Sequence, residues 1–335
     1  MLQTTTKLSG LVDLTRKRFA AMEADFLATG IASQLFMELP PSEGESIRID
    51  EFDTETFGED KPEGSDAVST DSDFGYNVTL SYRRIAREAT ITWEMEANNR
   101  YREIGTKLKS LIHFVPNRFE LDLTHIFTFA SSTEYTNLSG NSIAVDVGDD
   151  LAVASTVHTL NQSSSTYSNR LSGDPAFSKG SLESALTLAN TDILSSFGGR
   201  RVLNFNTIVT GRDPNTVHTV REYLMSQGAP DAAHSGVYNV IKDYQYKHVI
   251  LPYLDSTATG ANDSTKKRWW ALLAIGNGEG KSFPAYYSVK ERPTLLTPEI
   301  KDADIHNDNR TFGTRGYYGI RVLSGRGAIF SLPTS

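Results

Sequence analysis

The sequence contains no cysteine among its 335 residues. This absence excludes disulfide scaffolds, thiolate zinc sites, iron–sulfur clusters and cysteine nucleophiles, and any metal would need histidine or carboxylate ligands. The sequence also has no apolar run of about 18 residues, and the segment MLQTTTKLSG has no apolar signal core. We therefore expect no membrane partner, and we expect the chain to stay in the compartment where it is made.

The sequence has fewer basic residues (33) than acidic residues (41), and the net charge is -8. This balance argues against a protein whose whole surface binds phosphate. The segment 38–73 holds thirteen acidic residues against Arg48 and Lys61, a net charge of -11, so the rest of the chain carries +3. Because glycine, proline and serine punctuate this acidic segment, it is expected to be a solvated loop.

The flanks of the acidic segment have the period-two pattern of strands. Ser46–Phe52 and Tyr76–Met95 alternate apolar and polar residues. Roughly twenty extended residues would span about 65 Å, whereas ordinary strands have about five or six residues. We therefore predict a two-stranded β-arm that its own domain cannot cover and that other copies must bury. The candidate contacts between copies are Ile47, Ile49, Tyr76, Val78, Leu80 and Tyr82.

Helical periodicity follows the arm. Residues 9–29 suit a short amphipathic helix, and a second helix is predicted over Ala97–Val115, closed by Pro116. A further helical stretch is predicted over Arg118–Ala130. The core positions predicted for the Ala97–Val115 helix are Tyr101, Ile104, Leu108, Leu111 and Ile112, and the basic residues of its remaining face are Arg100, Arg102, Lys107 and Lys109. This basic face could meet nucleic acid or simply be solvated.

The carboxyl-terminal half mixes helices and strands without a regular βαβ rhythm, which predicts the α+β class. Gly198-Gly199 is expected to end a helix, and Asp213-Pro214 is expected to cap the next one. Strands are predicted over Val202–Val209, Tyr246–Leu251, Trp269–Ile275, Ala285–Val289, Thr311–Val322 and Ala328–Leu332.

Signatures of catalysis are absent from the sequence. There is no G-x-S-x-G elbow, and none of the seven histidines is followed by glutamate, so no H-E-x-x-H zinc helix exists. The run Asp302–Asp308 groups oxygen ligands and leaves a calcium or magnesium loop possible, but it lacks the glycine and closing glutamate of an EF-hand. We expect no catalytic residue, no metal and no cofactor.

The order of parts carries a resemblance. The β-arm Ser46–Met95 leads directly into the amphipathic helix, and a mixed domain with an insertion follows. Between Phe177 and Leu254, the helix Ser178–Phe197 ends at a glycine turn before a strand, the short helix Pro214–Met225 and a return strand. In this layout and spacing, nearly the whole chain resembles the major capsid proteins of tailed bacteriophages, which have the Hong-Kong-97-type capsid fold.

The resemblance implies names for the parts. These are an N-arm over 1–45, an E-loop over 46–93, a peripheral domain with a spine helix over 94–204 and 285–335, and an axial domain over 205–284. It also implies self-assembly into hexamers and pentamers of an icosahedral shell around double-stranded DNA, held without sequence specificity. The chain would then be a non-enzymatic component of the virion capsid, assembled in the bacterial host cytoplasm.

Other partners implied by the resemblance are a portal, possible decoration proteins and a scaffolding protein, which we expect to be separate because no long charged coiled-coil segment precedes the N-arm. Arg100, Arg102, Lys107 and Lys109 would face the lumen. Lys61 is the only lysine of the E-loop, and a lysine–asparagine cross-link is not carried over. Two alternatives stay open: an encapsulin-type compartment that encloses cargo enzymes, and a metal-dependent hydrolase that uses Asp302–Asp308.

Overall fold

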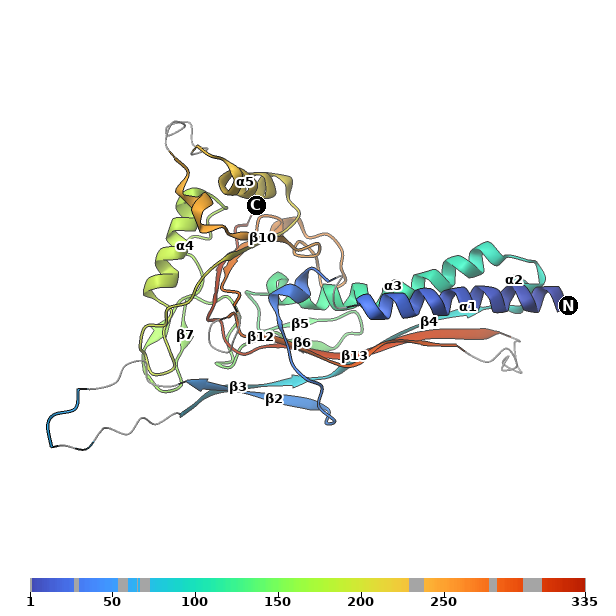
Figure 1. The fold of residues 1–335 in the computed structure, drawn as a ribbon, viewed down its shortest axis with the longest axis horizontal. Coiled ribbons are helices and arrows are strands. Elements are labelled where there is room, and N and C mark those ends of the chain that lie inside the picture. Colours follow the sequence, from blue (N-terminus) through green and yellow to red (C-terminus); the bar gives the residue numbers. More distant parts are fainter. Residues whose placement is uncertain are drawn as a thin grey trace.

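A computed structural model describes residues 2–26, 30–53, 60–64, 66, 73–228, 238–276, 282–297 and 309–334. The molecule is elongated (Figure 1). One end is an arm of two long helices above a sheet, the other end carries two shorter helices over a second sheet, and a β-hairpin runs beneath the body. The mixture of helices and separate, largely antiparallel sheets confirms the α+β class.

The arm pairs two long helices with a four-stranded sheet. Its helices are α1 (Leu2–Asp25), α2 (Trp93–Ala97) and α3 (Tyr101–Thr128). Its sheet has the order β1-β12-β13-β4, formed by β1 (Met37–Glu38), β12 (Ala285–Leu296), β13 (Arg310–Val322) and β4 (Arg83–Ile91). Buried residues of α1, α3, β4 and β13 form one apolar cluster, which holds the helices on the sheet. The helix predicted over residues 9–29 is therefore confirmed as a longer one that packs on α3.

The prediction that Pro116 closes the helix is wrong, because α3 continues through Pro116 to Thr128. A proline inside a helix removes one backbone hydrogen bond and costs about 3 kcal/mol. Val115 and Phe119 are buried on either side of it, and Leu123 lies in the core beyond. Burial of this continuous apolar face outweighs the local cost, so the two predicted helices are one.

The hairpin beneath the body is shorter than predicted. It consists of β2 (Ser46–Asp53) paired antiparallel with β3 (Asp73–Ser81). The predicted strand Tyr76–Met95 breaks at Tyr82, after which β4 leaves the hairpin and pairs with β13. The alternation of apolar and polar residues continues across Tyr82, so sequence periodicity did not reveal that the two halves belong to different sheets.

The second sheet has the order β10-β9-β11-β14. Its strands are β9 (Thr207–Thr210), β10 (Lys247–Ile250), β11 (Trp270–Leu273) and β14 (Ala328–Ser331). The helices packed near it are α4 (Lys179–Thr191), α5 (Pro214–Met225) and the 3-10 helix η3 (Val240–Tyr244). Its two faces contribute to two apolar clusters, one shared with α4 and α5 and one shared with the second half of α3.

Two local predictions here had different outcomes. The cap of α5 is confirmed, because the Asp213 carboxylate accepts from the backbone N–H of Thr216 and Pro214 is the first helical residue. The predicted end of α4 at Gly198-Gly199 is wrong, because the helix stops at Thr191. Gly198, at φ +84°, instead forms a turn between the bridged residues Leu194 and Arg200.

The remaining elements are short. They are η1 (Ala32–Leu35), η4 (Ser264–Lys266) and two small hairpins, β5 (Glu134–Thr136) with β6 (Ser142–Ala144) and β7 (His158–Thr159) with β8 (Thr166–Tyr167). The strand predicted over Val202–Val209 begins only at Thr207, and residues 201–206 belong to no helix or strand. This segment matters for the site because Arg201 and Leu203 face the hairpin across a groove.

Candidate functional surfaces

The basic residues predicted on α3 differ in what they contact. Arg100 donates to Glu103 at 2.7 Å, and Lys107 Nζ donates to the carbonyl oxygen of Thr90 at 3.0 Å. The side chains of Arg102 and Lys109 are exposed, and within the described ranges neither side chain has an ion-pair or hydrogen-bond partner. Seven residues apart, they lie on one side of the helix. Of the four basic residues, Arg102 and Lys109 are therefore the two whose charged groups remain available to a ligand.

The apolar stripe of α3 faces the interior of the arm. Ile104, Leu108, Leu111 and Ile112 are between 0% and 5% exposed, and Tyr101 packs at the edge of the same cluster. Ile104, Leu108 and Leu111 share this cluster with Leu8 of α1 and Phe312 of β13. These five positions hold the arm together.

The apolar side of the hairpin packs on its own chain. Ile49, Val78, Leu80 and Tyr82 are each no more than 8% exposed and cluster with Tyr286 and Leu323, while Ile47 packs at the margin. The half-buried Tyr76 has its hydroxyl 2.8 Å from Thr159 Oγ1. The argument that only other copies can cover these residues is therefore wrong for the described part of the hairpin. That they contact a neighbouring copy stays a prediction.

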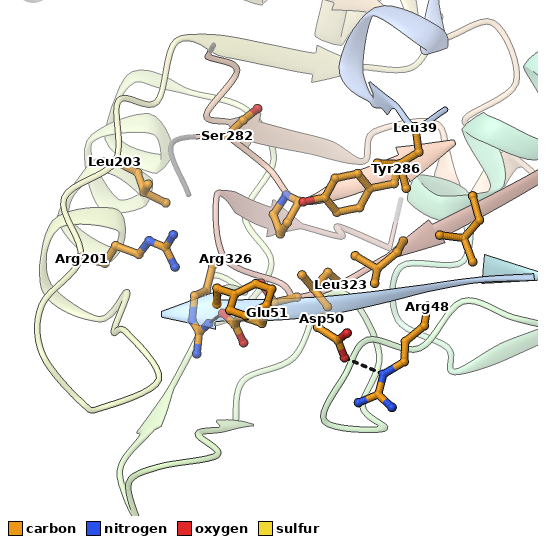
Figure 2. A pocket seen from close by; sticks show the side chains of 15 residues that line it. Leu39, Arg48, Asp50, Glu51, Arg201, Leu203, Ser282, Tyr286, Leu323 and Arg326 are labelled. Carbon is orange, nitrogen blue, oxygen red and sulfur yellow. Dashed lines mark hydrogen bonds and ion pairs between the residues drawn. The ribbon is translucent and has the colours of Figure 1, made fainter. Parts of the chain in front are cut away.

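A groove of about 310 Å³ runs along β2 (Figure 2). Six consecutive residues of β2, from Ile47 to Phe52, line it. Because successive side chains of a strand point to opposite faces, this run means that the strand edge itself faces the groove. Within the described chain β2 pairs only with β3, so this edge carries backbone groups that are open to a further strand.

The wall of this groove contains a buried ion pair that the sequence analysis missed. Glu51 of β2 accepts from Arg326, which lies in the turn between β13 and β14, and both side chains are less than 10% exposed. Burial lowers the pKa of Arg326 to about 10. The Arg326 guanidinium also lies 5.4 Å from the centre of the Tyr167 ring. The one feature of the sequence that could have pointed to this pair is the glycine on either side of Arg326, which is typical of a tight turn.

A second buried polar network lies between α3 and the arm sheet. Asp122, fully buried, accepts from Tyr318 at 2.8 Å and from Arg83 at 3.2 Å, and it pairs with Arg118 at 3.0 Å. His125, one turn further along α3, is also fully buried. Burial lowers the pKa of His125 to about 4, an effect that Asp122 opposes and Arg118 supports. The network has no access to a substrate and ties α3 to β4 and β13.

His158 is the histidine whose surroundings most resemble a catalytic arrangement. Its Nδ1 lies 2.9 Å from Asp149 Oδ2 and its Nε2 lies 3.2 Å from Asn169 Oδ1. The ring is 0% exposed and stacks on Tyr167. Both ring nitrogens are occupied by these contacts and no nucleophile is among them, so the arrangement braces the loops next to Arg326.

Exposed apolar side chains gather around the end of α5 and around η3. Met225, Tyr238, Val240 and Tyr244 are each more than half exposed. This group is called the tip patch below. In Figure 1, α5 lies at the top of the molecule, away from the long helices α1 and α3 of the arm.

No group of three or more potential metal ligands occurs within the described residues. The candidate ion loop at Asp302–Asp308 lies outside them. No helix in the described part of the chain is long and apolar enough to cross a membrane.

No protein-family model matches the sequence, and no curated protein matches it. Solved structures do. The capsid structure of the cyanophage P-SCSP1u superposes with a TM-score of 0.50 at 12% identity, covering 88% of this chain and 85% of that one. The mature capsid of bacteriophage PhiM1 superposes with a TM-score of 0.50 at 11% identity, covering 90% and 86%. The chain has the Hong-Kong-97-type capsid fold.

The resemblance inferred from the layout of the sequence is thus confirmed at the level of the fold. At 11–12% identity, the Hong-Kong-97-type architecture is shared without close sequence similarity. The architecture places the long helix α3 after the hairpin, its continuation β4 and the short helix α2, in the order that the sequence predicts. The fold could be recognised from the order of its helices and strands, because apolar periodicity reveals these elements even where the individual residues differ.

Proposed function

We propose that this chain is the major capsid protein of a tailed double-stranded DNA phage, assembling into the hexamers and pentamers of an icosahedral shell. The observation that carries the proposal is the fold, which matches phage capsid subunits over about nine-tenths of the chain. A shell subunit needs large self-complementary surfaces rather than a catalytic cleft. The open edge of β2 and the tip patch would supply parts of such surfaces.

The proposal assigns the parts as the sequence analysis did: an N-arm over 1–45, an E-loop over 46–93, a peripheral domain over 94–204 and 285–335, and an axial domain over 205–284. The tip patch belongs to the proposed axial domain, and its apolar side chains would meet their copies at the centre of a capsomer. The subunit would have no enzymatic activity. A scaffolding protein and a portal would be its partners in assembly, with room for decoration proteins on the shell, which would assemble in the host cytoplasm.

The proposed lumenal surface is the exposed side of α3. Its available charges are Arg102 and Lys109, and a mild positive screen would allow DNA to pack without being clamped. Arg102→Glu/Lys109→Glu is expected to leave shells intact and to reduce the DNA retained in them at low salt, and its difference from the wild type should shrink as salt rises. The control Lys179→Glu/Arg200→Glu makes the same change of charge elsewhere and should have no effect. Equal DNA retention in both variants would contradict the lumenal assignment.

The test of the main proposal is the size and content of the expressed full-length protein. Sedimentation and electron microscopy are expected to find capsomers or megadalton shells, with nuclease-protected DNA when the phage packaging proteins are present. Shells filled with a cargo enzyme instead would favour the encapsulin-type alternative. A persistent monomer that turns over a substrate with added divalent metal would favour the hydrolase.

A further inference from the structure

The hairpin has a defect in its register at Glu51. Asp50 pairs with Asn77 and Phe52 pairs with Phe74, so Glu51 alone faces Gly75 and Tyr76. This is a β-bulge, a feature that turns a side chain out of the regular alternation. A Cβ atom on Gly75 would lie 2.6 Å from Glu51 Oε2, so the absence of a side chain at position 75 makes room for the carboxylate. Both strands make a polar contact with the body at this bulge, Glu51 with Arg326 and Tyr76 with Thr159.

The body holds Arg326 in a rigid position. It lies between Gly325 and Gly327, and Gly327 has φ +81°, a conformation that glycine adopts without strain. A Cβ atom on Gly325 would lie 2.5 Å from Asn169 Nδ2, so the turn sits directly on the Asn169 and His158 network. Asn169 Nδ2 donates to the carbonyl oxygens of Val153 and Gly325, and these two hydrogen bonds hold the turn in place. The guanidinium therefore has little freedom to follow the hairpin.

We propose that Glu51 and Arg326 are positioning residues that set the angle at which the hairpin leaves the subunit, and thereby the position in which a neighbouring copy receives it. The inference rests on the proposed function. A buried ion pair contributes little net stability, because removing two charges from water offsets their attraction, but it defines one geometry. The apolar contacts of Leu80 and Val78 could tolerate a small rotation of the hairpin, whereas a buried charge pair could not.

The decisive variant is Glu51→Ala/Arg326→Ala, measured by amide hydrogen exchange on the full-length unassembled chain. Removing both residues leaves no unpaired buried charge, so the loss of stability is limited to the packing that the two side chains supply. Exchange within 46–53 and 73–81 is expected to accelerate at least ten-fold, while exchange in β9 and β11 stays as in the wild type. Arg48→Ala breaks the exposed ion pair with Asp50 on the same strand and should change neither. Wild-type exchange of the hairpin in the double variant would overturn the proposal.

Tyr76→Phe is the second variant, because it removes only the hydroxyl at the bulge and preserves the fold. It is expected to accelerate hairpin exchange by about three-fold, in the same direction as the double variant. Tyr76→Phe reports on the second contact at the bulge only. If the double variant fails to fold, Glu51→Gln/Arg326→Met, which removes both charges at similar side-chain volume, decides the question: local acceleration supports the proposal, and no acceleration overturns it.

Assembly provides the second readout. Shells of the double variant are expected to have a broader distribution of diameters than wild-type shells, and an unchanged distribution would overturn the link between the bulge and assembly. Failure of the wild-type chain to form any particle would contradict the proposed function instead. The exchange measurement still reports whether Glu51 and Arg326 position the hairpin.

Discussion

Replacing His125 with phenylalanine is expected to make the folded protein more resistant to acid. The His125 ring is 0% exposed and packs 4.7 Å from the Tyr135 ring and 5.3 Å from the Phe129 ring, measured between ring centres. Burial lowers its pKa from the usual 6.5 to about 4. Between these two values, the unfolded chain binds a proton at His125 and the folded chain does not. The free energy of unfolding must therefore fall as the pH falls through this window.

The size of the effect follows from the difference between the two pKa values. One unit of pKa corresponds to about 1.4 kcal/mol, so His125 alone should lower the free energy of unfolding by about 1 kcal/mol at about pH 5.5. At about pH 4.5 the loss should reach about 2–3 kcal/mol. Above about pH 7 the ring is neutral in both states and the residue adds no dependence on pH.

The assay is urea unfolding followed by far-ultraviolet circular dichroism at about pH 7, 5.5 and 4.5. His125→Phe is expected to lose less stability than the wild type on acidification, by the amounts given above. The variant and the wild type are compared because burial also lowers the pKa of His248 to about 4, which adds a loss common to both proteins. His113→Gln, an exposed change on the same helix, is the control and should behave as the wild type. Equal acid sensitivity of His125→Phe and the wild type would refute the reasoning.

Three further changes test the arm, the α5 cap and the hairpin. Leu108→Ala is expected to lower the free energy of unfolding by about 2–5 kcal/mol, whereas its exposed neighbour Lys109→Ala should change it by less than about 0.5, both measured in urea. Asp213→Ala should cost about 1 kcal/mol and Asp213→Asn much less, because asparagine keeps the oxygen that accepts from Thr216. Gly319→Ala would place a Cβ atom 2.9 Å from the Ser81 carbonyl oxygen, so proteolysis within the hairpin should accelerate. Gly313→Ala meets nothing closer than 3.7 Å and serves as its control, and identical proteolysis of the two would contradict the close packing at Gly319.

Features that depend on neighbouring residues were predictable from the sequence. Asp213-Pro214 marked the start of α5 because the cap and the helix lie within four residues of each other. The stripe from Ile104 to Leu111 was predictable for the same reason, since helical periodicity repeats over one or two turns. Features decided by distant contacts were not. The continuation of α3 past Pro116 depends on partners such as Tyr318, whose ring packs 4.9 Å from that of Phe119.

The same distinction explains the candidate surfaces. Alternation in Tyr76–Met95 identified an extended segment correctly as far as Ile91, although Trp93–Met95 belong to the helix α2. It carried no information about the segment's partner, which changes from β2 to β13 at Tyr82. The ion pair of Glu51 with Arg326 joins residues 275 positions apart, and neither has a local motif that names the other. Arg102 and Lys109 could be separated from Arg100 and Lys107 only once Glu103 and Thr90 were seen to engage the latter two.

The packing of the hairpin base on its own chain changes where contact between copies must be sought. The apolar face of β2 and β3 is already buried by Tyr286 and Leu323, so it adds little new apolar area to an interface. What remains outside are the open edge of β2 and outward residues such as Phe52, which is 67% exposed. Contacts through a strand edge depend on direction, because backbone hydrogen bonds form only when two strands align. For assembly, a hairpin held at one angle would therefore matter more than a hairpin with additional exposed apolar area. The buried pair of Glu51 and Arg326 is the contact that would hold this angle.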